Sequence, residues 1–430
     1  MSVERAPPHE RERLFWIGGL GLFTAAVSAA VRAGIAQDLK TQFIDPIDLA
    51  QSATMIGSAL GAAFLGFAGM LLVTSFVLDR VGAKTMLLLA SAMLLLGNLL
   101  VLLCGTLGLL SSYQLIWLGM LTSGLGWGAI EATINPLTAT LFAEDKTHRM
   151  NMLHAYWPAG VIVGGFIGVA IGRLGWDWRI AVGIVALLSS ALGALVLAHR
   201  FPPTAAAALG AKTEEKIGEL LRRPSFFVWF GLMFLTAASE LAPGQWVDVA
   251  LSSHVGMRGL LLLVYVSGLM FVGRHFAGPL VHRISSEGLL CVSSVLAAVG
   301  LYLLSIANSP LTALVAATCW GLGVCYFWPT MVAVAAERYH RAGTWAVGLM
   351  GMAGALSAYF VLPYLGKLYD QAKIQAAGGV DALVGLSGDR LLKVEAAASS
   401  RSFQLVALFP VVLFFAFGIA WLQHVRARNR

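Results

Sequence analysis

The segment GWGAIEATINP, residues 126–136, places a carboxyl group and an amide inside an otherwise apolar stretch of the chain. Glu131 and Asn135 are one helical turn apart, and apolar residues flank them on both sides. A charge at the centre of a bilayer costs roughly 2.5–3.5 kcal/mol on insertion scales, so such residues usually have a function there. The segment therefore predicts a membrane-embedded helix that carries a polar site.

The composition of the whole chain supports a lipid environment. Of the 430 residues, 58% are hydrophobic and 12% are charged, whereas a soluble domain has about 25% charged residues. The four cysteines lie in apolar stretches and have no CxxC spacing, which argues against a disulfide framework or a metal site. The formal net charge of +7 is better explained by basic loops beside a membrane than by a nucleic-acid partner.

About twelve apolar segments are long enough to cross a bilayer core, which takes roughly 20 helical residues. We expect helices, because backbone groups in lipid must bond within their own segment and the alternating pattern of barrel strands is absent. The first segment is too long for a signal peptide and is expected to be an uncleaved helix. The spans are predicted near residues 14–36, 52–78, 85–105, 113–142, 151–173, 178–199, 225–250, 258–280, 287–306, 310–335, 344–368 and 402–424.

A polar stretch at residues 200–224 separates six predicted helices from six. We therefore expect an N-terminal half at residues 1–199, a cytoplasmic linker at 200–224 and a C-terminal half at 225–430. Within the linker, TEEKIGELLRR favours a short amphipathic helix on the membrane surface. A second long loop, rich in Ala, Gly and Ser, is predicted at residues 369–401.

The distribution of lysine and arginine predicts the orientation. With the N-terminus inside, most basic residues fall in cytoplasmic segments, and the short outside loops hold only Lys40, Arg173, Arg179 and Arg258. The positive-inside rule then predicts a multi-pass protein of the cell (inner) membrane with both termini in the cytoplasm.

The chain contains a weak internal repeat. FVLDRVGAKTMLL after the second predicted helix parallels PLVHRISSEGLL after the eighth, about 203 residues later, and SGLGWGAIEATINP loosely parallels WGLGVCYFWPT. Two six-helix halves related by such repeats are typical of transporters, in which the substrate site lies near the midplane between the halves.

The turn DRVGAK, Asp79 to Lys84, resembles the signature loop G-x-L-x-D-R-x-G-R-K of the major facilitator superfamily. Ser75 stands where that pattern has its first Gly, and Ala83 replaces an Arg. Gly82 permits the tight turn, and Asp79 with Arg80 can form a breakable charged contact to neighbouring helices. The alternative is a solvated turn that ends a helix.

Four other segments resemble the fucose–galactose–hexose symporter family and together span most of the chain. They are the fourth helix with its following loop, FLTAASELAPGQW in the seventh helix, GRHFAGPLVHRIS in the eighth and YFWPTMVAVA in the tenth. The resemblance implies an all-α membrane protein with twelve transmembrane helices in two pseudo-symmetric halves, and cation-coupled uptake of a sugar. The matching positions are Glu131, Asn135, Pro136, Arg149, Asn151, Gly160, Glu240, Trp246, Gly273, Arg274, Gly278, Pro329 and Thr330.

Two positions depart from that family. Its acidic residue in the first helix, implicated in proton coupling, falls on Arg32, and its Asn in the fifth helix falls on Trp157. Arg32 favours a rival substrate class, a sugar acid or another organic anion, because a guanidinium in low dielectric suits a carboxylate better than a hydroxyl. Coupling to Na⁺ instead of H⁺ is a second alternative.

Glu131 has three interpretations. Desolvation favours the neutral form of a carboxyl, so Glu131 could load and release a proton near neutral pH. It could instead accept hydrogen bonds from sugar hydroxyls. The structural alternative is an ion pair with Arg32 across the cavity.

Glu240 lies within the seventh predicted helix, and Pro243 and Gly244 follow it. This Pro-Gly pair predicts a broken helix with exposed carbonyls, as in the discontinuous helices of transporters. Gln245 and Asp248 would extend a polar cluster that faces the cavity, and a simple helix kink is the alternative.

Tryptophans in the middle of spans are further candidate ligands, because the apolar faces of sugars stack on aromatic rings. Belts at the membrane interface would instead place Trp at helix ends, and helix packing is the alternative for each one. These residues are Trp127, Trp157, Trp246, Trp320 and Trp328. His154 and His275 are weaker candidates, since a lone histidine more often bonds a backbone carbonyl, and Arg274 is expected to brace helix ends or to pair with an acid.

We therefore predict a monomeric secondary transporter that moves a monosaccharide with H⁺ by rocking of two halves about a central cavity. Glu131 and Glu240 would handle the proton, and no cofactor is expected. The cavity would be lined by Arg32, Glu131, Asn135, Trp157, Glu240, Gln245 and Trp328. The gating residues would be Asp79, Arg80, Lys84, Arg149, Arg274 and Arg283.

Two other classes of function are less well supported. A membrane-embedded enzyme would need a catalytic constellation, and the sequence contains no HExxH motif, nucleophile elbow or phosphate-binding loop in a suitable context. A membrane sensor derived from a transporter would usually carry an additional soluble domain or a long tail.

Overall fold

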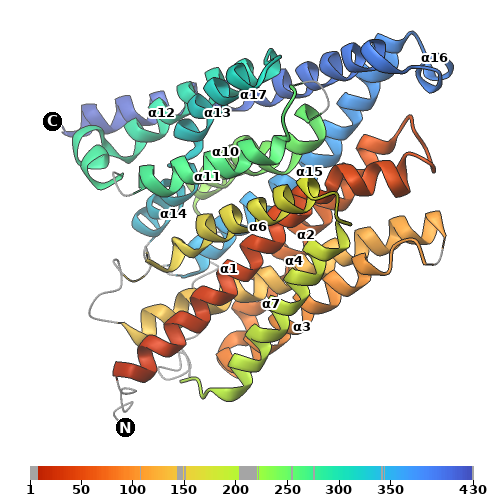
Figure 1. The fold of residues 1–430 in the computed structure, drawn as a ribbon. Coiled ribbons are helices and arrows are strands. Elements are labelled where there is room, and N and C mark those ends of the chain that lie inside the picture. The colour runs from red at the N-terminus through yellow and green to blue at the C-terminus, as the bar shows by residue number, and fades with distance from the viewer. Residues whose placement is uncertain are drawn as a thin grey trace.

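The computed structural model describes residues 8–106, 108–142, 149, 152–202, 220, 222–252, 255–274, 277–339, 342 and 344–428. Within these ranges every regular element is a helix (Figure 1). The helices are α1 (Pro8–Leu39), the π-helix η1 (Lys40–Ile44), α2 (Ser52–Val81), α3 (Ala83–Leu102), α4 (Leu109–Leu141), α6 (Tyr156–Arg173), α7 (Arg179–Ala198), α10 (Pro224–Leu251), α11 (Gly259–Arg274), α12 (Ala277–Ser305), α13 (Pro310–Val324), α14 (Phe327–Arg338), α15 (Thr344–Ala377), α16 (Val380–Val384) and α17 (Gly388–Arg428).

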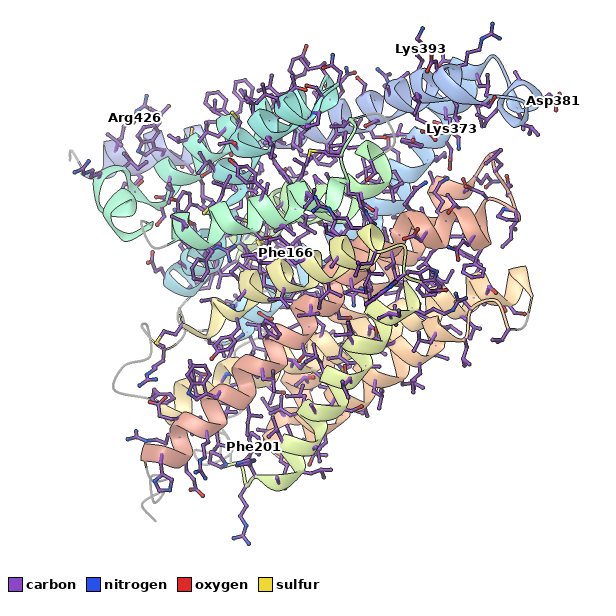
Figure 2. All side chains as sticks on the ribbon, in the orientation of Figure 1. Phe166, Phe201, Lys373, Asp381, Lys393 and Arg426 are labelled. Atoms are coloured by element: carbon purple, nitrogen blue, oxygen red, sulfur yellow. The ribbon has the colours of Figure 1, made fainter. Side chains whose placement is uncertain are left out.

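The predicted all-α membrane fold is confirmed. In the described part of the chain, ten helical segments are long and apolar enough to cross a membrane, and α4 and α11 occupy the positions of the two remaining predicted spans. Large apolar side chains cover the outer surface, for example Phe166 of α6, which is 55% exposed and labelled in Figure 2. Such exposure is expected where lipid, not water, is the solvent.

The start of α1 and the end of α17 lie at the same end of the bundle (Figure 1). We call this end the terminal end. The opposite end, which carries α16, the turns at residues 45–51 and 174–178, and residues 252 and 255–258, is the distal end. We refer to residues 8–199 as the N-terminal half and to residues 224–428 as the C-terminal half. Within the described residues the halves meet chiefly through α2 with α15 and α6 with α11, and α1 adds contacts to α10 and α11.

The internal repeat is visible in the backbone. Gly82 separates α2 from α3 with φ 84° and ψ 155°, and Ser285, 203 residues later, interrupts α12 with φ 67° and ψ 167°. Both residues lie in a region of positive φ and extended ψ that is essentially reserved for glycine. Ser285 is the one non-glycine residue with positive φ in the described part of the chain, so the second copy of the turn is strained.

The prediction of a long loop at residues 369–401 is wrong. α15 continues to Ala377, and α17 already begins at Gly388, so only the short segment around α16 is not part of a long helix. The Ala, Leu, Lys and Glu residues of this stretch are good helix formers, and Gly378 and Gly379 make the turn with positive φ. At about 1.5 Å per residue the 34 residues of α15 reach roughly 50 Å, which exceeds a bilayer core of about 30 Å.

The predicted amphipathic helix TEEKIGELLRR lies almost wholly outside the described residues, as do Asn151 and His275. The division of the chain at residues 1–199, 200–224 and 225–430 therefore stays a prediction.

The strained turn gives a test with opposite expectations at its two copies. Ser285→Gly should raise the free energy of unfolding by about 1 kcal/mol, because it removes backbone strain of about 1–3 kcal/mol and loses some chain entropy. Gly82→Ser should lower it by about 1–3 kcal/mol. Thermal unfolding of the detergent-purified variants measures both, and a lower midpoint for Ser285→Gly would mean that the contact of the Ser285 hydroxyl with the Gly288 N–H outweighs the strain.

Candidate functional site

A cavity lies between the two halves, near the middle of α1, α2 and α10. It contains about 480 Å³ of space not filled by protein atoms, counting the part that is open to solvent. Its lining residues are Leu22, Phe67, Trp127, Glu131, His154, Trp157, Glu240, Leu241, Arg274 and Trp328. The cavity therefore combines several aromatic rings with two carboxyl groups and one guanidinium.

One wall of the cavity is a stack of three aromatic rings from three helices. Phe67 of α2 stacks on Trp127 of α4 with ring centroids 3.9 Å apart and an interplanar angle of 10°. Trp127 in turn stacks on Trp157 of α6 at 4.7 Å and 20°. Within the described residues the indole Nε1 of Trp127 is buried without a close hydrogen bond and faces the carboxyl of Glu131. This wall therefore offers both a flat apolar surface and a donor.

Glu131 lies on α4 beside this stack and forms no ion pair with any residue that the structure describes. One turn later, the amide nitrogen of Asn135 donates to the backbone carbonyl of Glu131 at 3.1 Å. This bond leaves the amide oxygen of Asn135 facing Nε2 of His154 at 3.2 Å. Since that oxygen can only accept, the proton of neutral His154 is on Nε2 and its Nδ1 is an acceptor.

The C-terminal half contributes an ion pair to the same cavity. Arg274, the last residue of α11, lies 3.6 Å from Oε1 of Glu240 on α10. Glu240 is buried, and its second oxygen, Oε2, has no hydrogen-bond partner within the described residues. His154 lies close enough to Arg274 to interact with its charge, so polar groups of both halves meet here.

The position of Arg274 follows from a break in the tenth predicted span. Pro329 has no N–H, and its ring clashes with the carbonyl four residues earlier, which belongs to Cys325. The span is accordingly split into α13 and α14 at Cys325 and Tyr326. Nε of Arg274 donates to the freed Cys325 carbonyl at 3.2 Å, and the Tyr326 hydroxyl donates to the Gly273 carbonyl at 2.9 Å.

The expected break at Pro243 and Gly244 is wrong, because α10 runs without interruption from Pro224 to Leu251. Pro243 frees the carbonyl of Ser239 in the same way, but the indole N–H of Trp320 on α13 donates to that carbonyl at 3.0 Å. A partner from the neighbouring helix thus keeps α10 continuous. It also gives Trp320, one of the candidate ligands, a packing role away from the cavity.

Of the seven residues predicted to line the cavity, Glu131, Trp157, Glu240 and Trp328 do so, and Asn135 acts on it through His154. Gln245 is buried but does not line the cavity. Asp248 lies farther along α10, where it accepts hydrogen bonds from the hydroxyl of Ser252, the residue just after α10, and from the Leu260 N–H at the start of α11.

Arg32 does not reach the cavity. It lies ten residues after Leu22 on α1, about 15 Å along the helix axis. Its Nη1 donates to the hydroxyl of Ser28 at 2.7 Å, and its Nε has no hydrogen-bond partner within the described residues. The ion pair between Arg32 and Glu131, one of the alternatives considered from the sequence, is not formed in the part of the chain that the structure describes.

The predicted gating residues, apart from Arg274, lie at the terminal end. Arg149 forms a bidentate pair with Glu12 at 2.7 and 3.0 Å and lies over the ring of Phe142. Lys84 donates to the Leu197 carbonyl at 2.9 Å, and Arg80 and Arg283 are exposed. The side chain of Asp79 is outside the described part of the structure.

Several residues of the site and of the terminal end carry little signal in the sequence. Leu22, Phe67 and Leu241 are apolar residues in apolar helices, so nothing in the pattern distinguishes them. Glu287, which pairs with Arg338 at 2.6 Å and lies 3.6 Å from His424, occupies the second copy of the repeated turn. Its place in the repeat could have identified it as a counterpart of the first loop.

Comparison with known proteins identifies the family. The family model described as Major Facilitator Superfamily matches residues 14–363. The chain belongs to the Major Facilitator Superfamily. It is therefore a multi-pass membrane transporter and not an enzyme, and the all-α fold described above is that of the superfamily.

Solved structures of other transporters share the fold at low identity. A D-xylose–proton symporter superposes with TM-score 0.74 and 16% identity, covering 93% of this chain and 97% of its own. The nucleoside transporter NupG, in a mutant form, gives TM-score 0.72 and 12% identity, covering 95% and 99%. A bacterial homologue of the human lysosomal transporter Spinster, inward-facing and unoccupied, gives 0.76 and 12%, covering 98% and 99%. No curated protein matches this sequence significantly.

The ion pair in the cavity can be tested by stability. Arg274→Gln should lower the free energy of unfolding, because it leaves the Glu240 carboxylate without a cation. The loss should be smaller than the roughly 3–5 kcal/mol known for a fully buried pair, since the Arg274 side chain is 26% exposed. Thermal unfolding in detergent measures this, and Glu240→Gln/Arg274→Gln should recover most of the loss.

If the double variant is as unstable as Arg274→Gln alone, the stabilising contact is instead the one between Arg274 and the Cys325 carbonyl.

Proposed function

We propose that this transporter moves a neutral monosaccharide together with H⁺ across the cell membrane, with both chain termini in the cytoplasm. The observation that carries the proposal is Glu131, a carboxyl without an ion-pair partner among the described residues, beside a stack of aromatic rings in the central cavity. The excess of Lys and Arg in the segments at the terminal end supports the orientation.

The charges of the cavity favour a neutral substrate over an anion. Glu240 and Arg274 balance each other and His154 is taken as neutral, so the cavity has one negative charge when Glu131 is ionised and no net charge when it is protonated. Arg32, the residue that suggested an anionic substrate, lies outside the cavity and bonds Ser28. In neither state of Glu131 does the cavity offer the net positive charge that would attract a carboxylate, and a neutral solute does not need one.

The aromatic wall supports a sugar among neutral solutes. The stacked rings of Phe67, Trp127 and Trp157 present an extended flat surface, which matches the apolar face of a pyranose or furanose ring. Hydroxyls on the edge of such a ring need both donors and acceptors, and Trp127 Nε1, Nδ1 of His154 and the carboxyls supply them. The likeness to a D-xylose–proton symporter agrees with this substrate class.

Glu131 also gives a physical route to coupling. When protonated, it can donate one hydrogen bond and accept others, whereas the carboxylate only accepts. A sugar that uses the donor binds the protonated form more tightly, and by linkage the proton then binds more tightly when the sugar is present. Glu240 is held by Arg274, so the two carboxyls have different roles.

The first test is uptake into proteoliposomes. Neutral hexoses and pentoses should accumulate when the lumen is made alkaline, whereas uronic acids should not. Uptake of carboxylate sugars alone would contradict the neutral substrate, and accumulation that needs a Na⁺ gradient would contradict the coupling ion. Trp157→Ala should raise KM about three- to tenfold, since an aromatic contact contributes about 0.5–1.5 kcal/mol. Trp176→Ala, which changes an exposed Trp outside the cavity, is the matched control.

A second test separates transport from coupling. Glu131→Gln cannot lose or gain a proton, so it should abolish accumulation driven by a pH gradient and should leave sugar exchange between the two sides intact. The two assays are gradient-driven uptake and counterflow, with Asp381→Asn, a charge loss at the exposed distal tip, as control. Continued accumulation by Glu131→Gln would rule out this residue as the proton carrier.

A further inference from the structure

At the distal end, several contacts between the halves share one feature: a side chain of the C-terminal half binds main-chain groups of the N-terminal half. The clearest case is Asp370 of α15, whose side chain is buried, 3% exposed. Its Oδ1 accepts the N–H of Ala53 at 3.2 Å, and its Oδ2 accepts the N–H and the hydroxyl of Thr54, both at 2.7 Å. A carboxylate of one half thus caps the first turn of α2 in the other half.

This contact fits the needs of α2. The first N–H groups of a helix have no partner within the helix and attract negative charge. The residue before α2, Gln51, makes no capping hydrogen bond with its side chain. Asp370 supplies the missing cap from across the interface, and Nζ of Lys373, one turn later on α15, reaches the Leu49 carbonyl at 3.5 Å.

The backbones approach closely enough for such contacts because glycines line the α2–α15 interface. A side chain at Gly366 would meet the Ala53 carbonyl, and one at Gly57 would meet the Leu362 carbonyl. The Asp370 cap therefore lies at the end of a tightly packed seam.

A second seam lies between α11 and the helices α1 and α6. Here the side chain that crosses the interface is a cation, Arg258, and not a carboxylate as at Asp370. Nη2 of Arg258 donates to the Gly34 carbonyl of α1 at 2.7 Å, and Nη1 donates to the Gly168 carbonyl of α6 at 3.3 Å. Asp248 of the C-terminal half lies 3.5 Å from Arg258 and orients it. Leu260, one of the next residues, is fully buried against Gly34 and Gly168.

We propose that Asp370 and Arg258 are the gating residues of the distal end, which latch the two halves together by binding backbone groups and must release them when that end opens. Asp370 binds donors at a helix start and Arg258 binds helix carbonyls, so the two latches are complementary. Neither was among the gating residues expected from the sequence. The inference concerns the change of conformation only and is independent of the substrate.

The latch can be tested by distances between spin labels in nanodiscs. One label pair, Leu174→Cys and Val384→Cys, spans the two halves at exposed distal positions, and another, Leu197→Cys and Leu422→Cys, does so nearer the terminal end. A Cys319→Ser background suffices, because the other three native cysteines are buried. Asp370→Ala should raise the ratio of distal-open to distal-closed molecules at least tenfold, which lengthens the distal distance and shortens the terminal one.

Two further variants keep the test decisive if Asp370→Ala folds poorly. Thr54→Val removes one of the three bonds and should shift the populations in the same direction by a smaller factor, and Arg258→Gln should do so at the second seam. Asp381→Ala, with the same loss of charge at an exposed distal position, should leave both distances unchanged. Unchanged distances in folded Asp370→Ala and Arg258→Gln would overturn the proposal, as would a distal change without the reciprocal terminal one.

Discussion

A carbonyl without a partner inside a membrane-spanning helix is the constraint on which this architecture depends. Lipid offers no hydrogen bonds, so each carbonyl that a proline frees must find a donor within the protein. Pro243 frees the carbonyl of Ser239, and the indole N–H of Trp320 on α13 donates a hydrogen bond to it. Pro329 frees the carbonyl of Cys325, and the guanidinium of Arg274 on α11 donates a hydrogen bond to it. These two bonds tie α10, α11, α13 and α14 together around Glu240, and the second one brings a guanidinium into the cavity beside that carboxyl.

The fold could be predicted from the sequence because the length of each apolar segment and the positions of Lys and Arg can be read directly along the chain. Glu131 was accessible for the same reason, since a carboxyl in an apolar helix stands out in any sequence. The ends of α15 and α17 were not, because residues 369–401 are polar enough to resemble a loop and yet are good helix formers. Polarity reports contact with water, whereas helix propensity reports backbone conformation, and here the two diverge.

The site was harder to predict, for a different physical reason. A proline in the sequence reveals that a carbonyl is freed but not whether a neighbouring helix supplies a donor. Pro243 therefore suggested a break that Trp320 prevents, and the break is in the tenth span instead. Arg32 was misleading for a related reason. Its charge is evident from the sequence, but tertiary packing determines that its side chain binds the Ser28 hydroxyl and does not reach the cavity.

The turn at Ser285 has a consequence for how the two halves are related. Its backbone conformation matches that of Gly82 closely, although serine adopts it only under strain. If the halves descend from one duplicated ancestor, the backbone conformation of this turn has been kept in the second half although the glycine that adopts it without strain has been replaced by serine. At this turn the main-chain geometry is then better evidence of a common origin than the identity of the residues.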